Sequence, residues 1–139
     1  MILYLDTSAL VKAYITEEFS STVLSKIQEA DVVATHDIAF VEAYATFARL
    51  QREGKLTEEQ VITIKQEFSC DWENYLQINT TPFLIKDAAE LAEAFALRAY
   101  DSVHLAAAHY LQKSRNEPIQ FASFDYKLNQ AAKILGMLN

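Results

Sequence analysis

The sequence has few of the residues that cross-link a chain or form irregular loops. Of its 139 residues only two are glycine and two are proline, and Cys70 is the single cysteine. One cysteine excludes an internal disulfide, and the lack of a cysteine and histidine cluster excludes a structural zinc site. Because glycine and proline mark turns, their scarcity predicts short connections between regular elements.

Long apolar runs and targeting signals are also lacking. No apolar stretch approaches the roughly 20 residues that a membrane-spanning helix needs, and the opening segment MILYLD has no basic region of the kind that begins a signal peptide. We therefore expect a cytoplasmic protein. No GxGxxG or GxxxxGK[ST] motif is present either, which removes the main support for a dinucleotide-binding or P-loop protein.

Positive charge is scarce as well. Twelve lysines and arginines face nineteen acidic residues, so the formal net charge is −7. This balance argues against a protein that binds nucleic acid through a broad basic surface, unless bound cations neutralise part of the acidity. The hydrophobic fraction of 51% is sufficient for a core, and the length predicts one domain over residues 1–139.

Short apolar strands are predicted to alternate with helices along the chain. We expect strands over residues 2–5, 31–35, 76–80 and 119–122. We expect helices from Thr7 or Ser8 onward, over 20–29, 36–53, 57–75 and 81–97, from Asp101 onward, and over 124–135. Such alternation is typical of an α/β fold, in which helices sandwich a short parallel sheet.

Two aspartates follow predicted strands. Asp6 comes directly after the first strand, in ILYLD, and Asp125 lies just beyond the last strand, in IQFASFD. In a parallel α/β sheet ligands bind in the crevice at the carboxyl ends of the strands, so both side chains are expected to face the same crevice. Each aspartate is also common as a helix cap or a turn residue, and that structural alternative stays open.

Two further acids lie on apolar helix faces. Glu42, in HDIAFVEAYATFARL, shares a face with Ile38, and a buried carboxylate needs a partner or a cation. Asp101 opens the helix of ALRAYDSVHLAAA and shares its face with Leu105. The alternatives are a partly exposed glutamate and an aspartate that only stabilises a helix N-terminus.

Four carboxylates that converge on one pocket repel one another and destabilise the fold. With Mg²⁺ or Mn²⁺ between them, the same carboxylates form an oxygen-rich site for a hard divalent cation. We therefore interpret the four acids as a metal site, provided that the fold brings them together.

The sequence resembles a known family at four places. MILYLDTSALVKAYITEE, FVEAYATFARLQREGKLTEEQ, LRAYDSVHLAAA and FASFDYKLNQAAKILGM resemble, in this order, the successive motifs of PIN-domain ribonucleases. The closest likeness is to the VapC-type toxins of bacterial toxin–antitoxin pairs, and it covers essentially the whole chain. The resemblance implies a PIN-like fold and an acidic metal site. Its implied site residues are the four acids Asp6, Glu42, Asp101 and Asp125, with the hydroxyl residues Thr7 and Ser8 bracing the first acid.

The resemblance also implies an activity. Such proteins cut single-stranded or structured RNA, often tRNA or rRNA, and leave a 5′-phosphate and a 3′-hydroxyl. We expect one or two Mg²⁺ ions, with Mn²⁺ as a substitute, held directly by Asp6 and Asp101. Glu42 and Asp125 are expected to complete the cluster or orient the attacking water. The implied partners are an RNA substrate, a cognate antitoxin and a second copy of the chain.

Several other residues have less specific interpretations. Lys12 and Arg98 are close in sequence to site acids and are candidates for RNA contact, whereas Arg49, Arg52 and Lys55 are expected to be ordinary surface charges.

The histidines and aromatic residues are interpreted mainly as structural. His104 and His109 are expected to be structural, because hard Mg²⁺ prefers oxygen ligands. Trp72 and Tyr75 are expected to fill the core, with any exposed share of the 57–75 helix available as a dimer or antitoxin groove.

Two rival classes fit the sequence less well. A haloacid-dehalogenase-type phosphatase needs Asp-x-Asp after its first strand, where this chain has Asp6, Thr7 and Ser8. A receiver domain needs adjacent acids near the first strand, a central aspartate and a late lysine. A PIN-like scaffold without catalytic activity is the remaining alternative, although a pure scaffold gains nothing from four packed carboxylates.

Overall fold

The computed structural model describes all 139 residues and contains one four-stranded sheet. The strands are β1 (Ile2–Leu5), β2 (Val32–His36), β3 (Leu76–Ile78) and β4 (Ile119–Ala122), and they lie in the order β3-β2-β1-β4. Every pairing is parallel, so all the strands have their carboxyl ends at one edge of the sheet. The predicted α/β class with a short parallel sheet is therefore confirmed.

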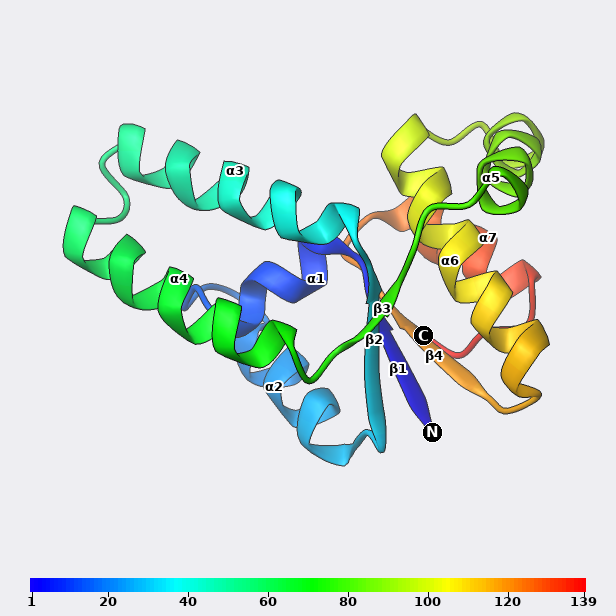
Figure 1. Cartoon of the computed structure of the whole chain (residues 1–139), viewed down its shortest axis with the longest axis horizontal. Coiled ribbons are helices and arrows are strands. Elements are labelled where there is room, and N and C mark those ends of the chain that lie inside the picture. Colours follow the sequence, from blue (N-terminus) through cyan, green and yellow to red (C-terminus); the bar gives the residue numbers. More distant parts are fainter.

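Helices cover both faces of the sheet (Figure 1). One face is covered by α1 (Thr7–Leu10), the 3-10 turn η1 (Val11–Ala13), α2 (Ser20–Glu29), α3 (Ile38–Arg52) and α4 (Glu58–Trp72). The other face is covered by α5 (Pro82–Phe95), α6 (Ala99–Arg115) and α7 (Tyr126–Ile134). None of these helices is both long and apolar enough to cross a membrane.

The central strand β1 explains the apolar run at the start of the sequence. Ile2 and Tyr4 belong to the core beneath α5, α6 and α7, whereas Leu3 and Leu5 belong to the core beneath α1, α3 and α4. Side chains alternate between the faces of a strand, and a strand buried on both faces is apolar throughout. The first polar side chain after this run is that of Asp6, at the carboxyl edge.

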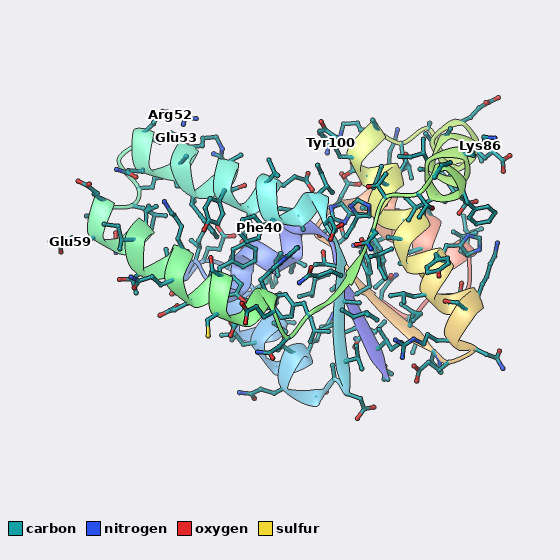
Figure 2. All side chains as sticks on the ribbon, in the orientation of Figure 1. Phe40, Arg52, Glu53, Glu59, Lys86 and Tyr100 are labelled. Carbon is teal, nitrogen blue, oxygen red and sulfur yellow. The ribbon has the colours of Figure 1, made fainter.

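Helices α3 and α4 form an antiparallel hairpin that extends beyond the sheet (Figure 1). Aromatic side chains hold the two helices together: Phe40 stacks on Phe68 at 5.3 Å between ring centroids and contacts Trp72 at 5.2 Å. In Figure 2 Phe40 lies at the sheet end of the hairpin, and the labelled Arg52, Glu53 and Glu59 lie at its outer end. Helix α4 begins with a capping box, in which the side chains of Thr57 and Gln60 each accept a hydrogen bond from the other's backbone nitrogen.

Several predicted boundaries were wrong by one to three residues. The long helix α3 spans Ile38–Arg52 rather than 36–53, α4 ends at Trp72 rather than 75, and β3 ends at Ile78 rather than 80. Helix α7 begins at Tyr126 rather than 124, because the side chain of Asp125 caps it by accepting a hydrogen bond from the Leu128 backbone nitrogen.

One further predicted helix start, that of α6, was wrong. The first helix begins at Thr7, as predicted, although neither Thr7 nor Ser8 caps it. Asp6 does so, because its carboxylate accepts a hydrogen bond from the Ala9 backbone nitrogen at 2.9 Å. Helix α6 begins at Ala99, two residues before Asp101, so that Asp101 lies in its first turn rather than at its head.

Candidate active site

Asp6 is the most buried of the four acids. It follows β1, is 3% exposed, and its Oδ1 accepts hydrogen bonds from Ser8 Oγ at 2.7 Å and from the Ala9 backbone nitrogen at 2.9 Å. Its Oδ2 accepts a third bond from Ser123 Oγ at 2.6 Å. Burial raises the pKa of Asp6 above its ordinary value, although these hydrogen bonds act in the opposite direction. The carboxylate is therefore fixed in orientation but incompletely compensated in charge.

Ser123 was not anticipated from the sequence. Its hydroxyl donates to Asp6 and accepts from the Asp125 backbone nitrogen at 3.0 Å, so one side chain links the first and the fourth acid. Ser8 makes a similar link, because it accepts from the Phe124 backbone nitrogen at 3.0 Å while it donates to Asp6. The only sequence signal is a serine directly after β4, and its role depends on the pairing of β4 with β1.

Glu42 reaches the same region from α3. Its Oε1 accepts a hydrogen bond from Thr7 Oγ1 at 2.7 Å and lies 2.9 Å from His104 Nε2. Burial raises the pKa of Glu42, but the bonds from His104 and Thr7 outweigh burial and hold the pKa below its ordinary value. Glu42 is thus an ionised carboxylate at neutral pH. Of the two hydroxyl residues predicted to brace Asp6, Ser8 does so, whereas Thr7 bonds to Glu42 instead.

His104 lies at the base of the site, and both of its ring nitrogens have hydrogen-bond partners. Its ring is 2% exposed, with Nδ1 at 2.8 Å from Tyr4 Oη and Nε2 at 2.9 Å from Glu42 Oε1. Burial raises the pKa of Tyr4 well above its ordinary value, so the phenol keeps its proton. Because the Glu42 carboxylate can only accept, His104 donates a hydrogen bond to it from Nε2. His109, by contrast, pairs with Asp87 between α5 and α6.

Asp101 and Asp125 are bridged by a cation from the chain itself. Arg98 Nε lies 3.2 Å from Asp101 Oδ2, and Arg98 Nη2 lies 3.5 Å from Asp125 Oδ2. The other oxygen of Asp125 caps α7. Because the Arg98 side chain is 82% exposed, solvent screens both ion pairs and they contribute little to stability. The guanidinium nevertheless places a positive charge between two carboxylates that would otherwise repel each other.

All four acids line one cavity of about 690 Å³ at the carboxyl edge of the sheet. The candidate RNA-contacting residues Lys12 and Arg98 line it too, and so does Arg49, which was expected to be an ordinary surface charge. Lys12 Nζ is bonded to Glu17 Oε1 at 3.1 Å and to the Glu18 carbonyl at 3.0 Å. The cavity therefore contains both the predicted acids and a partly neutralising basic rim.

The donor set suits a hard cation, but the side chains are not gathered around one point. The acidic side chains of the cavity offer carboxylate oxygens, which are the ligands that Mg²⁺ prefers. No cysteine lines the cavity. No three histidine, cysteine, aspartate or glutamate side chains lie close enough together to hold a metal ion as they stand. Metal binding thus requires side-chain movement, of which the release of Arg98 from Asp101 and Asp125 is the evident example.

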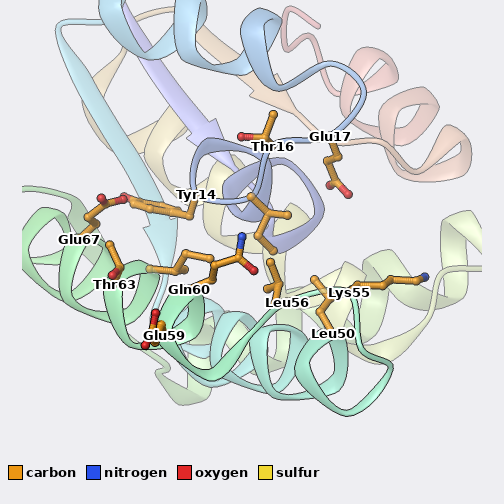
Figure 3. Close-up of a pocket in the computed structure, with 12 residues that line it drawn as sticks. Tyr14, Thr16, Glu17, Leu50, Lys55, Leu56, Glu59, Gln60, Thr63 and Glu67 are labelled. Carbon is orange, nitrogen blue, oxygen red and sulfur yellow. The ribbon is translucent and has the colours of Figure 1, made fainter.

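A second cavity, of about 720 Å³, adjoins the first (Figure 3). The two cavities share Ile15, Glu17 and Leu50 in their walls. Figure 3 shows Gln60 and Thr63 on the α4 side, with Thr16 on the opposite wall. The second cavity therefore lies beside the acidic site and is lined in part by the α3–α4 hairpin.

Comparison with known proteins agrees with this architecture. The sequence model of the PIN domain family matches residues 3–134 of this chain. The Mycobacterium tuberculosis protein named Ribonuclease VapC45 is 32% identical over 107 residues, which are 77% of this chain and 74% of that protein. The chain belongs to the PIN-domain family and is of the VapC type.

Solved structures show the same fold. The crystal structure of PAE2754 from Pyrobaculum aerophilum has a TM-score of 0.69 at 16% identity, covering 99% of this chain and 83% of that one. The structure of Mycobacterium tuberculosis VapC20, described as a sarcin-ricin loop cleaving toxin, has a TM-score of 0.66 at 14% identity, covering 93% and 94%. At these identities the likeness concerns the fold alone.

Proposed function

We propose that this protein is a metal-dependent endoribonuclease, the toxin component of a type II toxin–antitoxin pair, and that residues 1–139 act as one PIN domain. The observation that carries the proposal is the cavity lined by Asp6, Glu42, Asp101 and Asp125 at the carboxyl edge of a parallel sheet. The curated relatives are named as ribonucleases, which supports RNA as the substrate. We place the protein in the cytoplasm, where such a substrate is present.

We propose Mg²⁺ as the cofactor, with Mn²⁺ as a substitute, held by Asp6 and Asp101 and completed by Glu42 or Asp125. A divalent cation held by these residues would lower the pKa of bound water and stabilise negative charge on the leaving oxygen. Asp6 contributes a carboxylate whose orientation is set by three hydrogen bonds. Asp101 and Asp125 would hold the cation with the carboxylate groups that pair with Arg98 in this structure.

Glu42 is suited to orient the attacking water. Both of its hydrogen bonds, from Thr7 and His104, go to Oε1, which leaves Oε2 available. Because the carboxylate is ionised, it can orient a water molecule by accepting a hydrogen bond from it. Attack on phosphorus in line with the leaving 3′-oxygen then yields the 5′-phosphate and 3′-hydroxyl. Lys12 and Arg98 are proposed to contact RNA phosphates at the rim of the cavity.

We propose a basic antitoxin segment as the protein partner, and a homodimer as the functional unit. The second cavity, beside the active site, carries the acidic side chains of Glu17, Glu59 and Glu67 in its walls, together with a single lysine, Lys55. A segment rich in arginine or lysine complements this charge and reaches the active site through the shared wall. Occupation of both cavities at once explains how such a partner inhibits RNA cleavage.

The first experiment is cleavage of a labelled tRNA pool or total RNA by protein purified free of antitoxin, in Mg²⁺, Mn²⁺ or EDTA. The test variant is Asp101→Asn and the matched control is Asp87→Asn, since the two aspartate side chains are 21% and 22% exposed and Asp87 pairs with His109 outside the cavity. We expect discrete cuts that require metal, disappear in Asp101→Asn and persist in Asp87→Asn.

Cleavage that survives EDTA, or that Asp101→Asn retains in full, would contradict the proposal. If no RNA is cut, titration of the protein with Mn²⁺ by calorimetry decides between the remaining alternatives. Binding that Asp101→Asn loses supports an enzyme with a narrow RNA target. No binding to the wild-type protein indicates a scaffold without catalytic activity.

A further inference from the structure

A pair of exposed aromatic rings borders the acidic cavity and has no part in the mechanism above. Phe124, which lines the cavity, is 42% exposed, and Phe19 is 51% exposed. Their ring centroids are 5.5 Å apart and the ring planes differ by 20°, so the two rings are stacked. Burial of apolar area does not explain this arrangement, because about half of each residue remains in contact with water.

The position of Phe124 is tied directly to the first acid. Its backbone nitrogen donates to Ser8 Oγ at 3.0 Å, and Ser8 Oγ in turn donates to Asp6 Oδ1 at 2.7 Å. The preceding residue, Ser123, donates to Asp6 Oδ2 at 2.6 Å. These hydrogen bonds connect the backbone at Phe124 to the carboxylate that is proposed to bind metal, so this residue lies beside the first acid.

Phe19 reaches Phe124 through an unfavourable backbone conformation. Its φ of 68° lies in the left-handed region at the start of α2, where it makes no side-chain cap. For a bulky residue this conformation costs about 1–2 kcal/mol, and residues held in this way cluster at functional sites. The conformation brings an aromatic side chain from the α2 side of the cavity against one from the α7 side.

A cation completes the arrangement. Lys12 Nζ lies 4.6 Å from the centroid of the Phe124 ring. The chain as a whole carries a net charge of −7, so long-range attraction contributes little to holding a polyanion. Stacking of bases on aromatic rings does not depend on net charge, so it would add affinity for RNA to that of the phosphate contacts proposed for Lys12 and Arg98.

We propose that Phe19 and Phe124 form a stacking subsite for an unpaired nucleobase next to the phosphate that is cut. This inference rests on the proposed function, because it takes the acidic cavity as the place of the phosphate. The ligand is a nucleotide of single-stranded RNA or of a loop, with its base added to the stack and its phosphate near Lys12. A base within a duplex is already stacked on its neighbours, so the subsite favours unpaired RNA.

The test measures stacking rather than cleavage. The probe is a single-stranded octaribonucleotide with one 2-aminopurine, whose fluorescence is quenched on stacking, titrated with full-length protein in EDTA and again in Ca²⁺. We expect saturable quenching by the wild-type protein. Phe19→Leu and Phe124→Leu keep apolar bulk but remove the flat ring, and each is expected to weaken binding roughly 5- to 100-fold, from the effect of losing one stacked base.

Two further variants control for folding and for non-specific effects. Phe124→Trp restores a flat ring and is expected to restore quenching. Phe83→Leu removes a ring that is even more exposed, at 69%, but lines a separate cavity, and it is expected to bind like the wild type. Thermal unfolding of each variant identifies any that fails to fold.

The outcomes separate this proposal from the proposed function. Quenching by a protein that neither cuts RNA nor binds Mn²⁺ would refute the nuclease and leave the subsite intact. The absence of quenching by the wild-type protein, or wild-type affinity in both leucine variants, would refute the subsite. If those variants bound RNA normally but failed to form a dimer in sedimentation, the ring pair would belong to a protein contact instead.

Discussion

Replacement of Asp6 by asparagine is expected to stabilise the metal-free protein while it abolishes RNA cleavage. Asp6 is buried, and burial raises its pKa in the folded state above the value in the unfolded chain. Between the two pKa values the folded state binds more protons than the unfolded state, so stability falls as pH rises through this interval. At a pH above both pKa values the full cost of the buried charge is present unless a cation offsets it.

The size of the effect follows from the contacts of Asp6. Asparagine has the same shape, can accept from Ser8 and Ala9 through its oxygen, and can donate to Ser123 through its nitrogen. The raised pKa shows that desolvation outweighs the hydrogen bonds to the carboxylate. We expect the free energy of unfolding to rise by about 0.5–2 kcal/mol, the usual gain from relieving a strained active site. Asp6→Ala instead leaves buried donors without an acceptor and is expected to cost about 2–4 kcal/mol.

The assay is urea unfolding of the wild type and both variants in EDTA at about pH 4.5 and pH 7.5, repeated at the higher pH with Mg²⁺. The wild type is expected to be less stable at the higher pH and to regain stability with Mg²⁺. In Asp6→Asn residue 6 carries no charge, so we expect it to contribute neither the loss of stability at high pH nor the gain with Mg²⁺. The reasoning is refuted if Asp6→Asn is as unstable as Asp6→Ala at pH 7.5.

Three other predictions concern single contacts. Arg98→Ala removes a competing cation and should tighten Mn²⁺ binding roughly two- to fivefold, as expected for a screened ion pair; weaker binding by calorimetry would contradict this. His104→Leu removes a bond that lowers the pKa of Glu42, so the acid limb of the cleavage pH profile should move to higher pH, and an unmoved limb would count against a role for Glu42. Thr57→Ala removes the cap of α4 and should lower the free energy of unfolding by about 1 kcal/mol, measured with urea, without loss of cleavage.

Much of the fold could be predicted because its signals are local. The apolar run ILYL predicts a buried strand, and the segment from Thr57 onward predicts the helix α4. The caps of α1 and α7 could not be predicted in this way, because they depend on which side chain bonds to the helix N-terminus. Asp6 and Asp125 are such cases, since both were interpreted first as site acids and they also cap helices.

The acids themselves could be predicted, but not the groups that hold them. Asp6 and Asp125 follow strands, and the rule for parallel sheets brings the ends of strands to one edge. No such rule exists for Ser123, which is 117 positions from Asp6, or for His104, which is 62 positions from Glu42 and 100 from Tyr4. Hydrogen bonds between residues so far apart in the sequence leave no periodic pattern in it.

The sequence alone therefore determined the alternation of strands and helices and the types of residue at the carboxyl edge, because periodicity and capping act over a few residues. Only the tertiary structure decided which oxygen each carboxylate presents, in which directions the pKa values of Asp6 and Glu42 shift, and that Arg98 bridges Asp101 and Asp125. These properties depend on burial and on distances between side chains from different elements, and both arise only when the chain has packed around its sheet.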